Sequence, residues 1–186
     1  MRLPDTAHTS QPWRIHEIAY DFRLEDVWEL PSRGDAHDFP RLVERFASRD
    51  PAENSSLAVR ALFALRWKLG ELFGWDDPET GVGSRVPTLR DRLPADLRKA
   101  PTGPSPRNLS FIPLYLTEDE WAAEIANKTV HGVLHLGRVR GPESGNRVQM
   151  AVLVKPNGLL GSAYMVAIRP FRHLIVYPPL LRESAR

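Results

Sequence analysis

The last forty residues constrain the fold more strongly than any other part of the chain. Residues 147–155 alternate apolar and polar side chains, which predicts a strand whose apolar face holds Val148, Met150, Val152 and Val154. The Pro-Asn-Gly segment 156–158 ends that strand. Residues 159–181 then place apolar side chains at helical spacing, which predicts a C-terminal helix. This order favours an α+β fold in which a curved antiparallel sheet wraps around one long helix and leaves a cavity between them.

The N-terminal half predicts mainly helices. Asp38 as N-cap and Pro40 near the first helical position predict a helix whose apolar side holds Phe39, Leu42, Val43 and Phe46. The helical spacing of apolar residues is clearest over 56–73. Residues 13–19 alternate weakly and predict a first strand, whereas residues 24–30 predict a short helical turn.

The C-terminal half predicts strands at 108–116, 121–126 and 129–138, before the strand at 147–155. A two-residue turn at Asn127-Lys128 would put Glu124 opposite His131, Glu120 opposite His135, and Trp121 opposite Leu134. Carboxylates then meet imidazoles on the outer face, and apolar residues meet on the inner face. A helix beginning at the capping-box-like segment 117–120 is the alternative.

The chain of 186 residues predicts a single domain over 1–186. Residues 76–106 are rich in proline and glycine, so we expect a loop-rich insertion or lid, with short helical pieces around Leu89 and at 95–99.

Composition excludes several classes of protein. There is no cysteine, so disulfides and thiolate metal sites are excluded. The 25 basic and 23 acidic residues are interspersed, without the basic face of a nucleic-acid binder. No signal peptide and no apolar run long enough to span a bilayer is visible, which predicts a soluble cytoplasmic protein without a membrane span.

Motif searches predict no metal and no cofactor. On a strand, His131 and His135 lie roughly 13 Å apart, too far to chelate one ion. The acidic segment 76–79 lacks EF-hand spacing, and 81–85 completes no phosphate-binding loop. No nucleophile elbow is present, so whether the protein is an enzyme stays open.

A family resemblance follows from the segment 155–164 (KPNGLLGSAY) together with 168–175 (IRPFRHLI). It resembles the ending of an uncharacterised bacterial family, a domain of unknown function. That family is placed in the START-like, polyketide-cyclase-like helix-grip (SRPBCC) superfamily. The resemblance is close over residues 110–182 and implies a hydrophobic cavity between the sheet and the C-terminal helix. It implies no catalytic residue.

These observations predict a module that binds a hydrophobic or amphipathic small molecule, such as a lipid or polyketide. The predicted ligand-binding residues are Trp121, Ile125, Leu134, Met150, Val152, Tyr164, Ile168 and Phe171. Tyr164 would orient the polar end of the ligand. Two further functions stay open: a cyclase- or dehydratase-type enzyme that uses Tyr164 as acid or base, and a non-catalytic interaction protein. In the latter, the outer face would pair with a partner or form a homodimer.

Overall fold

The computed structural model describes residues 1–30, 38–48, 82–83, 86–107, 109–127, 129–141 and 145–158. The predicted helices at 56–73 and 159–181 lie outside these residues. The same is true of three predicted ligand-binding residues, Tyr164, Ile168 and Phe171.

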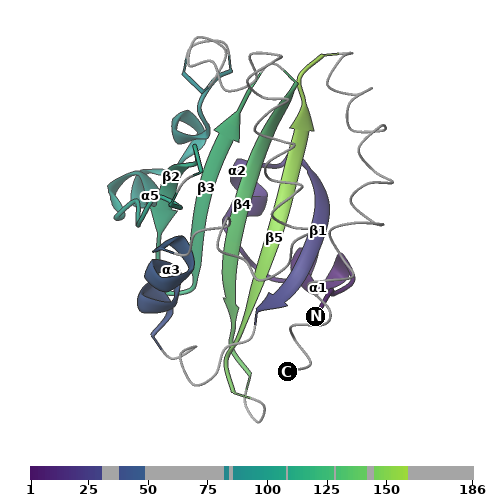
Figure 1. Cartoon of the computed structure of the whole chain (residues 1–186), viewed down its shortest axis with the longest axis vertical. Coiled ribbons are helices and arrows are strands. Elements are labelled where there is room, and N and C mark those ends of the chain that lie inside the picture. The colour runs from purple at the N-terminus through teal and green to yellow at the C-terminus, as the bar shows by residue number, and fades with distance from the viewer. Residues whose placement is uncertain are drawn as a thin grey trace.

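The described residues form an α+β structure built on one antiparallel sheet (Figure 1). Its strands are β1 (Arg23–Leu30), β2 (Ile112–Leu116), β3 (Glu120–Ala126), β4 (Val130–Val139) and β5 (Arg147–Pro156). The strand order is β1-β5-β4-β3-β2, so the first strand pairs with the last one. The strand predicted at 147–155 is therefore confirmed, and it lies between two other strands.

Five short helices accompany this sheet in the described part of the chain. They are α1 (Thr6–Thr9), α2 (Ile15–Ile18), α3 (Phe39–Ser48), η4 (Leu89–Arg92) and α5 (Ala95–Lys99). The predicted start of α3 is confirmed, because Asp38 Oδ1 accepts a hydrogen bond from the Arg41 N–H at 3.3 Å. The helical pieces predicted around Leu89 and at 95–99 are also confirmed.

Two N-terminal predictions are wrong. Residues 13–19 contain the one-turn helix α2 instead of a strand, and residues 24–30 belong to strand β1 instead of a helical turn. Ile15 and Ile18 are both fully buried, because three-residue spacing puts them on the same side of a helix. In β1, pairing with β5 along the whole strand outweighs a weak local preference for helix.

The β3–β4 hairpin exists, which excludes the helix starting at 117–120, but its predicted register is wrong by two residues. Trp121 pairs with Leu136, and Ala126 pairs with His131. The loop is longer than predicted, because the Asn127 side chain accepts hydrogen bonds from the N–H groups of Thr129 and Val130. A shift by two residues keeps every side chain on its predicted face of the sheet.

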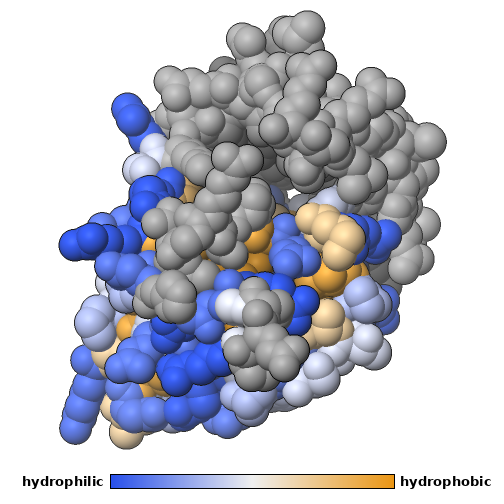
Figure 2. Space-filling model, turned by 90° about the horizontal axis from the view of Figure 1, so that it is seen from below, coloured by the Kyte–Doolittle hydropathy of each residue, from blue (hydrophilic) through white to orange (hydrophobic). Residues whose placement is uncertain are grey.

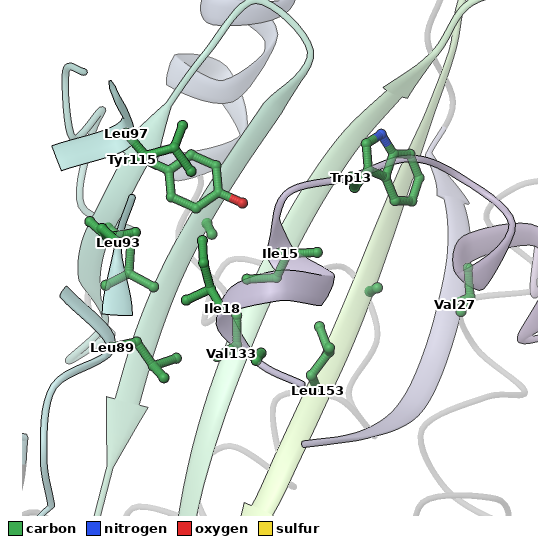
Figure 3. Close-up of a cluster of buried hydrophobic side chains, with 14 residues drawn as sticks. Trp13, Ile15, Ile18, Val27, Leu89, Leu93, Leu97, Tyr115, Val133 and Leu153 are labelled. Atoms are coloured by element: carbon green, nitrogen blue, oxygen red, sulfur yellow. The ribbon is translucent and has the colours of Figure 1, made fainter. Parts of the chain in front are cut away.

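Both faces of the sheet are covered. One face carries the first core cluster, where α2 and the 89–97 segment pack against the sheet residues Val133 and Leu153 (Figure 3). The covering segments contribute Ile15, Ile18, Leu89, Leu93 and Leu97. The other face packs against α3 through Phe39, Leu42 and Val43. The described part of the predicted lid thus contributes side chains to the core; its motion as a lid stays a prediction.

The described surface is mainly hydrophilic when the molecule is seen from below, with hydrophobic residues visible between (Figure 2). The exposed large hydrophobic residues of the described part are scattered: Met1, Tyr20 and Ile112. No helix among the described residues is long and apolar enough to cross a membrane.

Candidate functional site

The predicted ligand-binding residues that the structure describes share one face of the sheet. They are Trp121 and Ile125 on β3, Leu134 on β4, and Met150 and Val152 on β5. Trp121 is fully buried and Leu134 nearly so. Four of the five belong to, or pack against, the core cluster beneath α3. In the described part, four of these five residues contribute to a packed core.

Trp121 also shows how tightly that core is packed. Its indole Nε1 is buried without a hydrogen-bond partner. A Cβ placed on Gly103 would lie 2.9 Å from this nitrogen, so the glycine backbone sits directly against the indole edge. The unpaired donor is therefore a consequence of close packing at this point, because a ligand atom has no room there.

The opposite face of the sheet holds two carboxylate–imidazole pairs. Glu124 Oε2 lies 2.8 Å from His131 Nε2, and Glu120 Oε2 lies 3.4 Å from His135 Nε2. The pairing of these residue types was predicted, but their position on an outer face is wrong. All four side chains are buried, because α2, η4 and their flanking segments cover this face.

The Glu120–His135 pair forms part of a chain of buried polar groups. His135 Nδ1 lies 3.1 Å from His8 Nε2. Burial alone raises the pKa of Glu120, but hydrogen bonds from His135, the Arg14 N–H and Tyr115 outweigh it and lower the pKa below its ordinary value. Glu120 is thus an ionised acceptor, and His135 Nε2 carries a hydrogen towards it.

The His8 and His135 imidazoles of this buried polar network are held neutral. Burial, and then the nearby His135 and His16, lower the pKa of His8 to about 2. Burial also lowers the pKa of His135, although Glu120 opposes this effect. His8 therefore donates through Nε2 to His135 Nδ1, and its own Nδ1 is buried without a partner. This arrangement joins the N-terminal segment to the sheet.

The Glu124–His131 pair lies instead beside a pocket of about 380 Å³. The pocket is at the end of the sheet where β3 and β5 end and β4 begins, the upper end in Figure 1. The described residues that line it are Val86, Pro87, Arg92, Asn127, His131, Lys155, Asn157 and Gly158. Its lining combines two cations, an imidazole and two amides.

One carboxylate partly balances the two cations. Asp21 accepts a hydrogen bond from Arg92 at 2.6 Å and one from Lys155 at 2.7 Å. The hydrogen bond from Arg92, with that from Lys155, holds the pKa of Asp21 well below its ordinary value. The group of three carries one net positive charge, which the nearby Glu124 carboxylate offsets.

The two amides have structural partners. Asn157 donates a side-chain hydrogen bond to the Asn127 carbonyl at 2.8 Å, and its backbone N–H donates to Thr129. These contacts tie the β3–β4 loop to the end of β5. They shape the wall of the pocket, which leaves Arg92, Lys155 and His131 as the ionisable side chains of the described lining.

The sequence predicted that His131 pairs with Glu124, but on an outer face and not at a pocket, and it missed the rest of this site. Arg92, Lys155 and Asp21 lie far apart in the sequence, and no motif joins them. One signal was available: residues 130–139 place apolar side chains on both faces of a strand, including Val133 beside the two imidazoles. Such a strand is typical of the buried centre of a sheet. Among the described residues, no cluster suited to a metal ion occurs.

Comparison with known proteins identifies a family. A family model described as "Protein of unknown function (DUF2867)" matches residues 18–179. No curated protein and no solved structure matches the chain. The matched segment includes every described strand, both carboxylate–imidazole pairs and the described residues of the pocket. Because the match spans more than half of the chain, the protein belongs to this family of unknown function.

Proposed function

We propose that the protein binds a small organic molecule bearing a carboxylate or phosphate group in the pocket beside His131. The observation that carries the proposal is the presence of two cationic side chains and an imidazole around one cavity of about 380 Å³. Anions bind most strongly where several charge-assisted hydrogen bonds converge.

Both cations keep N–H groups available for a ligand. Lys155 uses one of its three donors on Asp21. Arg92 uses three of its five donors, on the Ile18 carbonyl and on Asp21. Both side chains are partly exposed, at 42% for Lys155 and 33% for Arg92. Asp21 holds them in place, and with the Glu124 carboxylate the four groups are formally neutral, so the free N–H groups, and not a net charge, would bind the anion.

A purely structural role is the competing explanation, because the same ion pairs join η4, the segment after α2, and β5. Isothermal titration of the protein with inorganic phosphate and with 2-oxoglutarate separates the two. We expect both anions to bind, and the dimethyl ester of 2-oxoglutarate to bind at least about tenfold more weakly, since it lacks the charges that Arg92 and Lys155 would contact.

A pair of lysine variants completes this test. Lys155→Met keeps the aliphatic stem but removes the charge, so the affinity for both anions should fall by about tenfold. Lys99→Met is the matched control, because Lys99 lies on α5 outside the described pocket lining and should leave the affinity unchanged. Absence of anion binding, or equal losses in both variants, would contradict the proposal.

A second candidate is a hydrophobic or amphipathic ligand, lipid- or polyketide-like, held between the other face of the sheet and a C-terminal helix. It is supported by the shared face of Trp121, Ile125, Leu134, Met150 and Val152. The START-like helix-grip assignment is part of this proposal, supported by a five-stranded antiparallel sheet whose last strand precedes residues 159–181. Native mass spectrometry of the purified protein with lipids tests it; a protein that retains none would count against it.

Catalysis by Tyr164 and partner binding through the sheet have less support. A cyclase- or dehydratase-type reaction with Tyr164 as acid or base rests on a residue outside the described part. An interaction surface made of Glu120, Glu124, His131 and His135 is excluded, because these side chains are buried within the chain. A homodimer and a cytoplasmic location stay proposals; the lack of cysteine is compatible with a reducing compartment.

A further inference from the structure

We propose that the Glu124–His131 pair makes the pocket a proton-transfer site. His131 would remove a proton from the carbon next to the carbonyl of a bound 2-oxo acid. The inference rests on the anion-binding function proposed above and adds to it a reaction and a substrate class. Four observations support it: the oriented imidazole, its free nitrogen, the buried carboxylate behind it, and the neighbouring cations.

The hydrogen bonds around Glu124 determine which nitrogen of His131 carries the hydrogen. The fully buried Glu124 carboxylate accepts from the Leu89 N–H at 3.0 Å and from the Thr88 hydroxyl. His131 Nε2, at 2.8 Å, is a further partner of this carboxylate. An ionised carboxylate can only accept hydrogen bonds, so Nε2 carries the hydrogen. In the neutral ring, Nδ1 then carries the lone pair, as a general base requires.

The position of His131 leaves that lone pair available. Nδ1 has no hydrogen-bond partner among the described residues and is not one of their buried unpaired atoms. His131 itself lines the pocket. The Phe22 ring packs edge-on against the imidazole with 4.9 Å between centroids, which limits rotation of the ring. The base is therefore held by Glu124 and Phe22 and has one nitrogen left for a ligand.

The cations supply the second requirement of the reaction, which is stabilisation of the negative charge that forms on the carbonyl oxygen. When His131 Nδ1 takes the proton, the C–H bond breaks and its electron pair forms a C=C bond. The carbonyl π electrons move to oxygen, so an enolate forms. A Lys155 or Arg92 N–H can stabilise that negative charge, and Glu124 stabilises the imidazolium. The imidazolium N–H then exchanges with solvent, and delivery of a solvent-derived proton to the same carbon completes an exchange that needs no oxidant or co-reactant.

Exchange of hydrogen for deuterium provides the experiment. The protein is incubated with 2-oxoglutarate in deuterium oxide, and loss of the C3 proton signal is followed by NMR. We expect the wild type to accelerate the exchange at least about tenfold over buffer. His131→Gln should lower the rate to about that of buffer, because a general base typically contributes about 10²–10⁴-fold, while 2-oxoglutarate still binds in the titration. His16→Gln is the matched histidine control and should keep the rate, because His16 bonds to the His8 carbonyl away from the described pocket lining.

Two further measurements separate a base from a merely structural histidine. In His131→Ala, added imidazole should restore part of the exchange, since a free imidazole can occupy the vacated space. If the variants fail to fold, diethyl pyrocarbonate is used on the wild type instead. Modification of His131 should stop the exchange, and 2-oxoglutarate should protect this histidine from modification.

The outcomes distinguish this inference from the function on which it rests. If 2-oxoglutarate binds but its C3 protons exchange no faster than in buffer, the proton-transfer inference is wrong and anion binding stands. The inference is equally wrong if His131→Gln or modified His131 exchanges at the wild-type rate, or if imidazole restores nothing to a folded His131→Ala. If neither 2-oxoglutarate nor phosphate binds, both proposals fall together; if phosphate alone binds, only the proton-transfer inference is wrong.

Discussion

Two carboxylate–imidazole pairs lie on the same face of the same sheet, and Glu124–His131 is the one that borders the pocket described among the placed residues. Glu120 with His135 and Glu124 with His131 have the same sequence spacing within each strand. In both, the glutamate on β3 and the histidine on β4 lie diagonally across the strand pair. The two pairs therefore have the same position relative to the strands. They differ in the segments that cover them.

At the first pair, the N-terminal segment closes over the imidazole. His8 Nε2 donates a hydrogen bond to His135 Nδ1. The centroids of the Trp13 and His135 rings lie 5.0 Å apart. At the second pair, η4 supplies hydrogen bonds to Glu124 but leaves His131 beside the pocket. A buried pair whose nitrogens are all bonded supports the fold, whereas a pair with one nitrogen left at a cavity is suited to chemistry.

The largest expected effect comes from removing each carboxylate. Glu120→Ala leaves four donors without their acceptor, on Arg14, Ile15, Tyr115 and His135. We expect the free energy of unfolding to fall by about 4 kcal/mol or more, because each unpaired buried donor costs roughly 1–3 kcal/mol. Glu124→Ala should cost less, about 2–3 kcal/mol, because water from the pocket can reach His131.

Urea unfolding followed by circular dichroism measures both losses. Glu118→Ala is the control, because its side chain is 88% exposed and should change stability little. Equal losses for Glu120→Ala and Glu124→Ala would remove the distinction between a closed and an open pair.

The next effect tests the cover of the closed pair. A Cβ on Gly137 would lie 2.4 Å from the Trp13 ring, so Gly137→Ala must push Trp13 away from His135. Overpacking of this kind costs about 1–3 kcal/mol. Gly132→Ala on the same strand is the matched control, since its Cβ would meet Ile125 at an ordinary 3.4 Å. Thermal unfolding of both variants provides the comparison; equal melting temperatures would contradict the tight contact with Trp13.

The pH dependence of the closed pair is a graded effect, small just below pH 6.5 and larger at lower pH. The pKa values of His8 and His135 are lowered from 6.5 in the folded protein, so below this pH the unfolded chain binds protons that the folded chain does not. Their contribution is complete above pH 6.5 and declines as the pH falls, by up to about 1.4 kcal/mol per pH unit for each histidine. The lowered pKa of Glu120 adds a further loss only below its unfolded value of 4.5.

Urea unfolding at pH 7, 6 and 5 measures this decline. His8→Gln introduces an amide that can still donate a hydrogen bond to His135 but does not titrate. The free energy of unfolding should therefore fall less steeply below pH 6.5 than in the wild type. An unchanged slope would show that His8 takes up its proton in the folded state.

The order of the strands in the C-terminal half was predictable because apolar and polar side chains alternate along a strand, which is a local signal in the sequence. Residues 147–155 alternate apolar and polar side chains, and Asp38 with Pro40 indicates the start of α3. The predicted strand and the predicted helix start are both confirmed. Residues 13–19 and 24–30 failed because their patterns are short and weak, and their partners are remote in the sequence. The hairpin register failed through one side chain, Asn127, whose hydrogen bonds lengthen the loop.

The sequence by itself determined which residues share a face of the sheet, because side chains alternate along a strand and a shift of two residues preserves that alternation. It therefore paired glutamates with histidines before any contact was known. Only the tertiary structure decided which face is covered, and where Arg92, Lys155 and Asp21 meet. Those contacts join residues as many as 134 positions apart. Packing in three dimensions brings such residues together, and no local pattern in the sequence predicts these contacts.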